Sequence, residues 1–362
     1  MFMRRRTIGW GVLLAVLIAL VAVQSRRLVA LRKAGLPESY AGYTTQEPPA
    51  LTFILAGLGG FRGIVAEVLW FRAERLQSEG RYLELVQLSD WLTRLDPHAA
   101  ETWAYNAWNL AYNISAMMAR AEDRLRWVRN GIRLLRDDAL RYNPRDAKLY
   151  RELAWMYLNK VGDHYDTCHL AYKRDLAQAM KPYLTDAGAI LPTEEARQGL
   201  AALRLDVDRM REIEKNFGSL DWRLAESHSL YWAYTGLPFS QTDQKNTEQM
   251  LLRRIIYQSL MVSVFRGRLE SDPADTEHWK ASGNLALAPA AERELRQTME
   301  QFPSRNMDQV YLHFVGRLAA AEKIAGNDWQ ADFFYRIFQT KFPAGQPCPT
   351  MQQLVEDARN NE

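Results

Sequence analysis

Cysteine is scarce in this 362-residue sequence: only Cys168 and Cys348 are present, and neither stands in a CxxC or CxxCH motif. Two cysteines exclude a disulfide-rich framework, a zinc site built from paired CxxC motifs and covalent haem attachment. They leave two alternatives, which are one long-range disulfide in an oxidising compartment or two unpaired thiols.

The short motifs of several enzyme classes are also absent. The sequence has no GxSxG nucleophile elbow, no GxGxxG dinucleotide loop and no GK[ST] phosphate loop. Paired carboxylates such as Asp137-Asp138 are adjacent, so on a helix they point in different directions and are expected to be solvated. We therefore expect no catalytic residues and no cofactor.

The densest group of potential metal ligands is DHYDTCH, Asp163 to His169. On a helix, His164 and Cys168 would share a face and supply half of a zinc site, but the sequence offers no second half. The alternative is a polar loop that leads into a helix, and no metal site is expected. His228 and His313 lie in apolar helical patterns and are expected to be core histidines.

Acidic residues are absent from residues 1–33, which carry seven basic side chains. The formal net charge of +3 therefore leaves about −4 (3 − 7) for the rest of the chain. A nucleic-acid-binding protein needs a basic face on its folded domain. We expect no nucleic-acid partner.

Charge of either sign is absent from Thr7 to Val23, and arginines flank this apolar run. Nineteen residues separate Arg6 from Arg26, and a helix of that length spans ~28 Å, close to the thickness of a bilayer core. The sequence predicts a basic tail at 1–6, a transmembrane anchor at 7–25 and a linker at 26–50. A cleaved signal peptide is the alternative, with only Val23-Gln24-Ser25 near a cleavage pattern.

The orientation of this anchor follows from its flanking charges, which are nearly equal on the two sides. Because moving the three N-terminal arginines outward would oppose the membrane potential, we expect the N-terminus inside and the large domain outside. In a bacterium this is a single-pass inner-membrane protein with a periplasmic domain. The apolar segment 51–70 is either a second span or, as Arg62 and Glu67 favour, an interfacial or buried segment that enters the first domain helix.

Long runs of β-branched residues are few, and apolar residues recur every three or four positions, as in the stretch Gly80 to Pro97. This spacing predicts helices rather than strands, and hence an all-α protein. A second stretch, Gly326 to Pro343, also places proline seventeen residues after glycine.

Several of these positions resemble the tetratricopeptide repeat (TPR), a helix–turn–helix unit of about 34 residues. In the first unit they are Ala73, Leu76, Gly80, Tyr82 and Pro97. The resemblance implies a TPR-like helical-hairpin solenoid over 51–362 that is irregular in the middle. Its units are expected near 66–99, 100–146, 147–180 and 312–345.

The second unit is longer than the repeat, because Pro97 and Pro144 are 47 residues apart. We expect an insertion within 113–125. In the irregular middle, Thr193 is an expected N-cap, and an apolar stripe predicts a helix from Glu194 that ends at Gly218. Further helices are expected through 224–236 and 248–269. The segments GGFRG, YRELAW and LDWRL also resemble bacterial membrane-anchored TPR-like proteins of uncharacterised activity.

In the TPR family, first helices line a concave face that binds peptides or partner helices. The resemblance therefore implies an aromatic groove with a basic end at Lys148 and Arg151. The expected groove residues are Trp70, Glu74, Tyr105, Trp108, Tyr112, Lys148, Arg151, Trp155 and Asn159. The alternative is that several of these aromatic residues pack between repeats. The family's carboxylate clamp is not expected, because Trp70 and Ala104 stand where its leading lysine would be.

The function expected from these patterns is a membrane-anchored scaffold that binds a protein or peptide partner in a bacterial envelope, secretion or surface-assembly complex. Two alternatives remain open. One is an accessory or assembly subunit of a membrane enzyme complex. The other is a helical enzyme acting on envelope polymers, which would show a deep pocket with convergent carboxylates.

Overall fold

The computed structural model describes residues 62–242, 246–273, 275 and 278–360. These residues form an all-α protein whose helices pack as neighbouring pairs. The strands within this part are β1 (Arg268–Leu269) and β2 (Ala281–Ser282), which pair antiparallel with Arg268 opposite Ser282. No helix in the described ranges is long and apolar enough to span a bilayer. The anchor and linker predicted at 7–50 lie outside them.

The chain divides into two compact units, Met1–Thr102 and Trp103–Glu362. In the first unit, α3 (Arg62–Ser78) and α4 (Tyr82–Leu95) form a hairpin. Gly80 has φ +69° and ends α3, and the Arg81 N–H donates a hydrogen bond to the Leu76 carbonyl at 2.9 Å. A glycine reaches this left-handed conformation without steric cost, which explains the expected turn.

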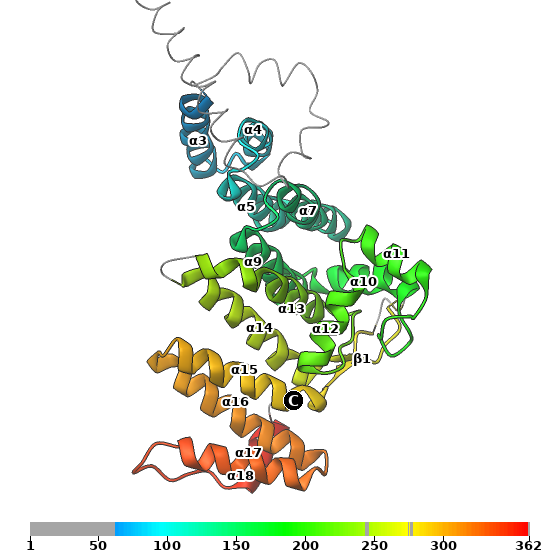
Figure 1. Cartoon of the computed structure of the whole chain (residues 1–362), viewed down its shortest axis with the longest axis vertical. Helices are drawn as coiled ribbons and strands as arrows, with labels where there is room; N and C mark the ends of the chain where they lie inside the picture. The colour runs from blue at the N-terminus through cyan, green and yellow to red at the C-terminus, as the bar shows by residue number, and fades with distance from the viewer. Residues whose placement is uncertain (1–61, 243–245, 274, 276–277, 361–362) are drawn as a thin grey trace, which may run out of the picture. The chain divides into compact units, whose positions relative to one another are not determined.

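The same turn recurs in the second unit between α16 (Arg305–Ile324) and α17 (Asp328–Lys341), drawn in orange to red in Figure 1. Gly326 has φ +81°, and the Asn327 N–H donates to the Glu322 carbonyl at 2.8 Å. The buried apolar residues of α4 and α17 also match in register. They are Leu85, Leu88 and Leu92 in α4, and Ala331, Phe334 and Phe338 in α17. Helix α18 (Met351–Asn360) packs against α16.

The hairpin after Pro97 is long because both of its arms are long. Its first arm runs from Ala100 to Met117 and its second from Ala121 to Tyr142, and each arm contains a π-helical segment. The insertion expected within 113–125 is therefore not a loop, since only three residues separate the arms. The elements are α5 (Ala100–Trp108), η3 (Asn109–Ile114), α6 (Ser115–Met117), α7 (Ala121–Arg133), η4 (Leu134–Ala139) and α8 (Leu140–Tyr142).

Helix α9 packs mainly against α13, and α13 packs against α14, so these three form the middle of the second unit (Figure 1). A Cβ atom added at Gly236 would lie 2.3 Å from the Tyr150 Cβ, which shows how closely α9 and α13 approach. Their bounds, with the π-helical η5 that continues α9, are α9 (Ala147–Trp155), η5 (Met156–Val161), α13 (Ala225–Gly236) and α14 (Thr247–Arg266). The helix predicted through 224–236 is thus confirmed, and the one predicted through 248–269 is confirmed as far as Arg266, after which Arg268–Leu269 form β1.

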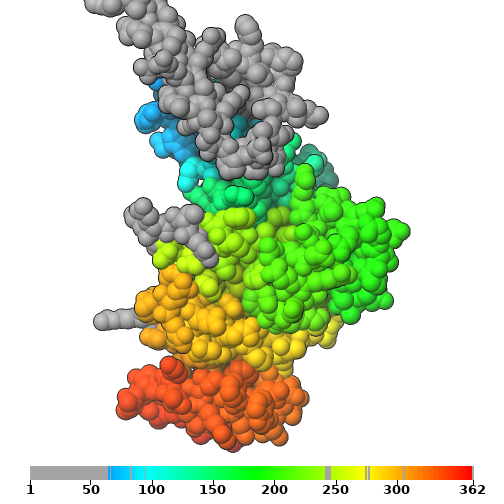
Figure 2. Space-filling model, in the orientation of Figure 1, coloured from blue at the N-terminus to red at the C-terminus, as the bar shows by residue number. Residues whose placement is uncertain are grey.

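Residues 162–224 separate α9–η5 from its partner α13 and form the large green bulk on one side of Figure 2. Helix α10 contacts η5 and α7, so the second helix expected for the unit 147–180 does not pair with α9. The helical segments of this part are α10 (His169–Met180), η6 (Lys181–Tyr183), α11 (Glu194–Ala202) and α12 (Val207–Phe217). Later segments are η7 (Leu237–Thr242), η8 (Leu285–Leu287) and α15 (Ala288–Gln301).

The prediction of a single helix from Glu194 to Gly218 is wrong, because the helix is interrupted between α11 and α12. Arg204 adopts a left-handed φ of +60°, and the Asp206 carboxylate caps α12 by accepting the Asp208 N–H at 2.8 Å. The predicted N-cap at Thr193 is confirmed, since its hydroxyl accepts the Ala196 N–H at 3.1 Å.

The structure also bears on three smaller expectations, which concern the cysteines, the segment 162–168 and two histidines. Cys168 and Cys348 are free thiols, so the disulfide alternative is wrong. The segment 162–168 is a polar loop that leads into α10, as expected. His228 is buried, whereas His313 is exposed on α16 and is not a core histidine.

The LDWRL segment forms a buried polar junction. The Asp221 carboxylate accepts two hydrogen bonds from the Arg223 guanidinium, from Nε at 2.9 Å and from Nη2 at 2.7 Å. It also accepts a hydrogen bond from the Leu269 N–H at 2.9 Å. The Asp221 side chain is fully buried and that of Arg223 is 10% exposed. This junction ties the segment before α13 to strand β1.

Candidate functional site: an aromatic cleft beside helix α9

The nine expected groove residues fall in both units. Trp70 and Glu74 lie on α3 in the first unit, where the Trp70 Nε1–H donates to a Glu74 carboxylate oxygen at 3.2 Å. Because each unit is described by itself, one surface across all nine residues stays a prediction. The other seven lie in the second unit and are Tyr105, Trp108, Tyr112, Lys148, Arg151, Trp155 and Asn159.

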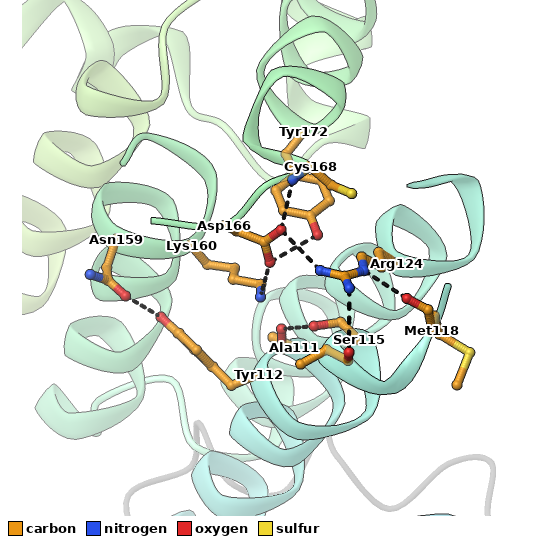
Figure 3. A network of polar contacts seen from close by, with 11 residues as sticks. Ala111, Tyr112, Ser115, Met118, Arg124, Asn159, Lys160, Asp166, Cys168 and Tyr172 are labelled. Carbon is orange, nitrogen blue, oxygen red and sulfur yellow. Dashed lines mark hydrogen bonds and ion pairs between the residues drawn. The ribbon is translucent and has the colours of Figure 1, made fainter. Parts of the chain in front are cut away.

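Three of these seven residues form a continuous row. The rings of Trp108 and Tyr112 stack with centroids 5.3 Å apart. Figure 3 shows the Tyr112 hydroxyl donating a hydrogen bond to the Asn159 amide oxygen, at 3.2 Å. Tyr112 lies in η3 and Asn159 in η5, so two π-helical segments place the two side chains together. Trp108 remains 39% exposed, so this row presents an aromatic surface to solvent.

Trp155 and Asn159 also line a cleft of about 310 Å³ between α9–η5 and α14, which we call the α9–α14 cleft. A volume of this size is typical of the smaller sites that bind one side chain or a small molecule. Its lining from α14 is mainly apolar or amide in character and comes from Gln258, Met261, Val262 and Arg266. Two of the nine expected groove residues therefore line one concave surface.

A second cleft of about 340 Å³ adjoins the first, because Glu226 and Arg266 line both. It lies beside α10, with Lys173 on that helix and Trp279 near β2. Glu226 belongs to α13 and is only 6% exposed. A buried carboxyl group at the junction of two clefts is the most chemically distinctive feature of this region.

The electrostatics of this junction are set mainly by burial. Burial raises the pKa of the Glu226 carboxyl, Asp163 adds to that shift, and Lys173 and Arg266 oppose it. Burial likewise lowers the pKa of the Lys173 ammonium, which Glu226 partly offsets. Perturbed groups in a cleft are characteristic of functional sites, although structural ion pairs also produce them.

The expected basic end of the groove is compensated by acidic neighbours. Arg151 pairs with Glu152 at 2.8 Å and with Glu248 at 2.7 Å, and its side chain is 18% exposed. Glu248 lies in the first turn of α14, 97 positions from Arg151 in sequence. Arg151 therefore joins α9 to α14, and its charge is not free to attract a partner.

Sequence reasoning missed the polar network beneath the aromatic row. Its centre is the Asp166 carboxylate (Figure 3). This group accepts hydrogen bonds from the Lys160 ammonium at 2.6 Å, from the Tyr172 hydroxyl at 3.2 Å and from the Cys168 N–H at 2.8 Å. Arg124 adds a contact at 3.4 Å. Burial alone would raise the pKa of Asp166, but Lys160 and the other donors hold it below its usual value.

This network positions the aromatic row. The Lys160 ammonium lies 5.3 Å from the centre of the Tyr112 ring, and Lys160 follows Asn159 directly in η5. The available signal was the density of polar residues in DHYDTCH, which indicated a loop but not its partners. No group of three or more His, Cys, Asp or Glu side chains suited to a metal occurs in the described ranges.

Comparison of the sequence with protein-family models and with curated proteins finds no match. The functional interpretation therefore depends on the geometry of the chain itself.

Proposed function

We propose that this protein is a membrane-anchored scaffold of TPR-like helical hairpins that binds a protein partner in a bacterial envelope, secretion or surface-assembly complex. The hairpins α3–α4 and α16–α17 support the TPR-like description, because both turn at a glycine with positive φ and bury matching positions. Helical hairpins of this kind present extended surfaces on a rigid frame.

The observation that carries the proposal is the α9–α14 cleft with its aromatic row. Trp155 and Met261 supply apolar contact area, and Trp and Tyr residues dominate the binding energy of many protein interfaces. Asn159 and Gln258 supply amide groups, and the Gln258 Oε1 accepts no hydrogen bond from the described residues. These groups suit an extended partner segment that inserts an apolar side chain and pairs its main chain with the amides.

The anchor predicted at 7–25 would hold this domain at the membrane, with the domain in the periplasm. The exposed side chains on α3 support a location near a lipid surface, since Ile64, Val68 and Phe71 are each more than 60% exposed and share a helical face. A reporter fused to the C-terminus should be active only outside the cytoplasm. Cytoplasmic reporter activity would contradict this orientation.

Replacing Trp108 and Trp155 together by alanine should reduce partner recovery at least tenfold, because tryptophan truncation at an interface centre typically costs about 2 kcal/mol or more. The measurement is cross-linking in intact cells followed by mass spectrometry of the captured proteins. The control is Trp329→Ala on α17, which removes a tryptophan that is 75% exposed outside the cleft. If the double variant is folded by circular dichroism and captures the same partner at native yield, the site assignment is wrong.

The second candidate is a helical enzyme, favoured by one observation: Asp163 and Glu226 line the same cleft, and the pKa of Glu226 is raised. Acid catalysis on glycosidic bonds uses a carboxyl group with a raised pKa near a second carboxyl group. Asp163, however, is held by its own loop, because it accepts the His164 N–H at 2.6 Å.

Glu226→Gln separates the two candidates in the same experiment. The substitution keeps the size of the side chain, so a scaffold should retain its partner. An enzyme should lose hydrolysis of envelope polysaccharide while it still binds it. Loss of a hydrolytic activity that the native chain displays would favour the enzyme over the scaffold.

A further inference from the structure

A separate cavity of about 190 Å³ lies between α7 and α10 and shares no lining residue with the α9–α14 cleft. One face of each helix lines it, with residues spaced three and four apart. The apolar lining includes Leu125, Val128, Ile132, Leu176, Met180 and Leu205. An apolar cavity of about 150 Å³ in another protein is known to hold benzene, so this one has room for a slightly larger molecule.

Most polar groups around this cavity already have partners. Arg129 pairs with Asp175 across the two helices, and Arg136 pairs with Asp137 at 2.8 Å. The hydroxyl of Tyr172 donates to Asp166 at 3.2 Å. The remaining tyrosine and arginine of the lining are also paired, Tyr157 with Arg136 and Arg133 with Asp137. These groups therefore do not require a ligand.

His228 is the exception. His228 lines the cavity and is only 2% exposed, and its Nδ1 has no hydrogen-bond partner among the described residues. The other ring nitrogen, Nε2, lies 3.0 Å from the Trp222 carbonyl. A carbonyl only accepts, so Nε2 carries the hydrogen and Nδ1 presents a lone pair. Burial lowers the pKa of His228 to about 4, which keeps the ring neutral at pH 7.

We propose that the cavity between α7 and α10 binds a small, uncharged aromatic molecule with a single N–H or O–H donor, which donates a hydrogen bond to the His228 Nδ1. The apolar walls select the body of the ligand, and a buried acceptor without a partner selects the donor. A ligand that lacks the donor would fill the same space and leave Nδ1 unpaired. The Arg129–Asp175 pair bridges the two helices and forms part of the cavity lining.

The test uses the full chain in detergent, indole as the probe and isothermal titration, with titration into empty micelles subtracted. Indole has one N–H donor, and 1-methylindole has the same ring system without it. We expect saturable binding of indole at one site, with 1-methylindole at least tenfold weaker. Absence of saturable indole binding, or equal binding of the two probes, would overturn the proposal.

Two variants locate the site. His228→Phe keeps an aromatic ring but removes the acceptor, so the tenfold preference for indole should disappear. Leu176→Trp fills the cavity and should abolish binding of both probes, which covers the case in which His228→Phe does not fold. The control, Gln178→Trp, adds the same side chain at an exposed position of α10 that does not line the cavity. Retention of indole binding by Leu176→Trp would also overturn the proposal.

Discussion

Asp221→Asn is expected to lower the free energy of unfolding by about 3–5 kcal/mol, because it removes one partner of a buried ion pair. The Arg223 guanidinium would remain buried without a counter-charge. The asparagine amide group would also place donor hydrogens where Arg223 and the Leu269 N–H now donate at 2.7–2.9 Å. Urea unfolding of the native chain and the variant, followed by circular dichroism, measures the difference.

The chain contains a matched control for this substitution. Arg197 and Asp208 form the same two-bond arrangement, at 3.0 and 2.9 Å, but their side chains are 41% and 70% exposed. Water solvates both charges when that pair is broken, so Asp208→Asn should leave the unfolding midpoint almost unchanged. If the two substitutions have equal effects, burial is not what makes the Asp221 junction important.

Asp166→Asn is expected to have the second large effect, again about 3–5 kcal/mol by the same argument. The Lys160 side chain is 7% exposed, and Asp166 is its anion at 2.6 Å. Because the folded state lowers the pKa of Asp166, its contribution is present above the ordinary value of 3.8 and is lost as the pH falls through the lowered value. Unfolding measured between pH 7 and pH 2 should therefore show a larger acid-dependent loss of stability for the native chain than for the variant.

Replacing the other partner of this ion pair should lower the free energy of unfolding by less. Lys160→Met removes the ammonium but leaves the Asp166 carboxylate with the Cys168 N–H at 2.8 Å and with Arg124 at 3.4 Å. Asp166→Asn leaves Lys160 with aromatic rings as its nearest cation-binding groups. Equal losses for the two variants would contradict the central role assigned to Asp166.

The hairpin turns were predictable because their cause is local. Gly80 and Gly326 each follow a helix at the position that requires positive φ, and glycine meets that requirement without strain. Helices α13 and α14 were predictable for a related reason, since an apolar repeat of three and four residues is visible within a single segment.

The break between α11 and α12 was not predictable from periodicity. Apolar residues continue through it, and Leu205 and Val207 are both buried. The break depends on Asp206, whose carboxylate accepts the Asp208 and Arg209 N–H groups and starts a new helix. From the sequence alone, an aspartate within an apolar pattern is equally consistent with an N-cap and with a solvated position inside a helix. Tertiary packing decides between these two alternatives.

The candidate site likewise has features that could be predicted from the sequence and features that could not. Trp155 and Asn159 follow each other at four-residue spacing on one arm, so their shared face could be predicted from the sequence. The roles of Arg151 and Asp166 could not, because Glu248 is 97 positions from Arg151 and Arg124 is 42 positions from Asp166. Local patterns contain no information about which distant charges will meet.

The separation of α9 from its packing partner has a consequence for synthesis of the chain. Residues 155 and 225 are 70 positions apart, so α9 is complete long before α13 exists. At roughly 5–20 residues per second, the ribosome needs about 4–14 s to make the intervening segment. During that time Tyr150 and Ala154, which are buried and contact α13 in the finished fold, lack that helix. A nascent chain of this protein therefore exposes an apolar helix for seconds, which makes it a substrate for chaperones that bind such segments.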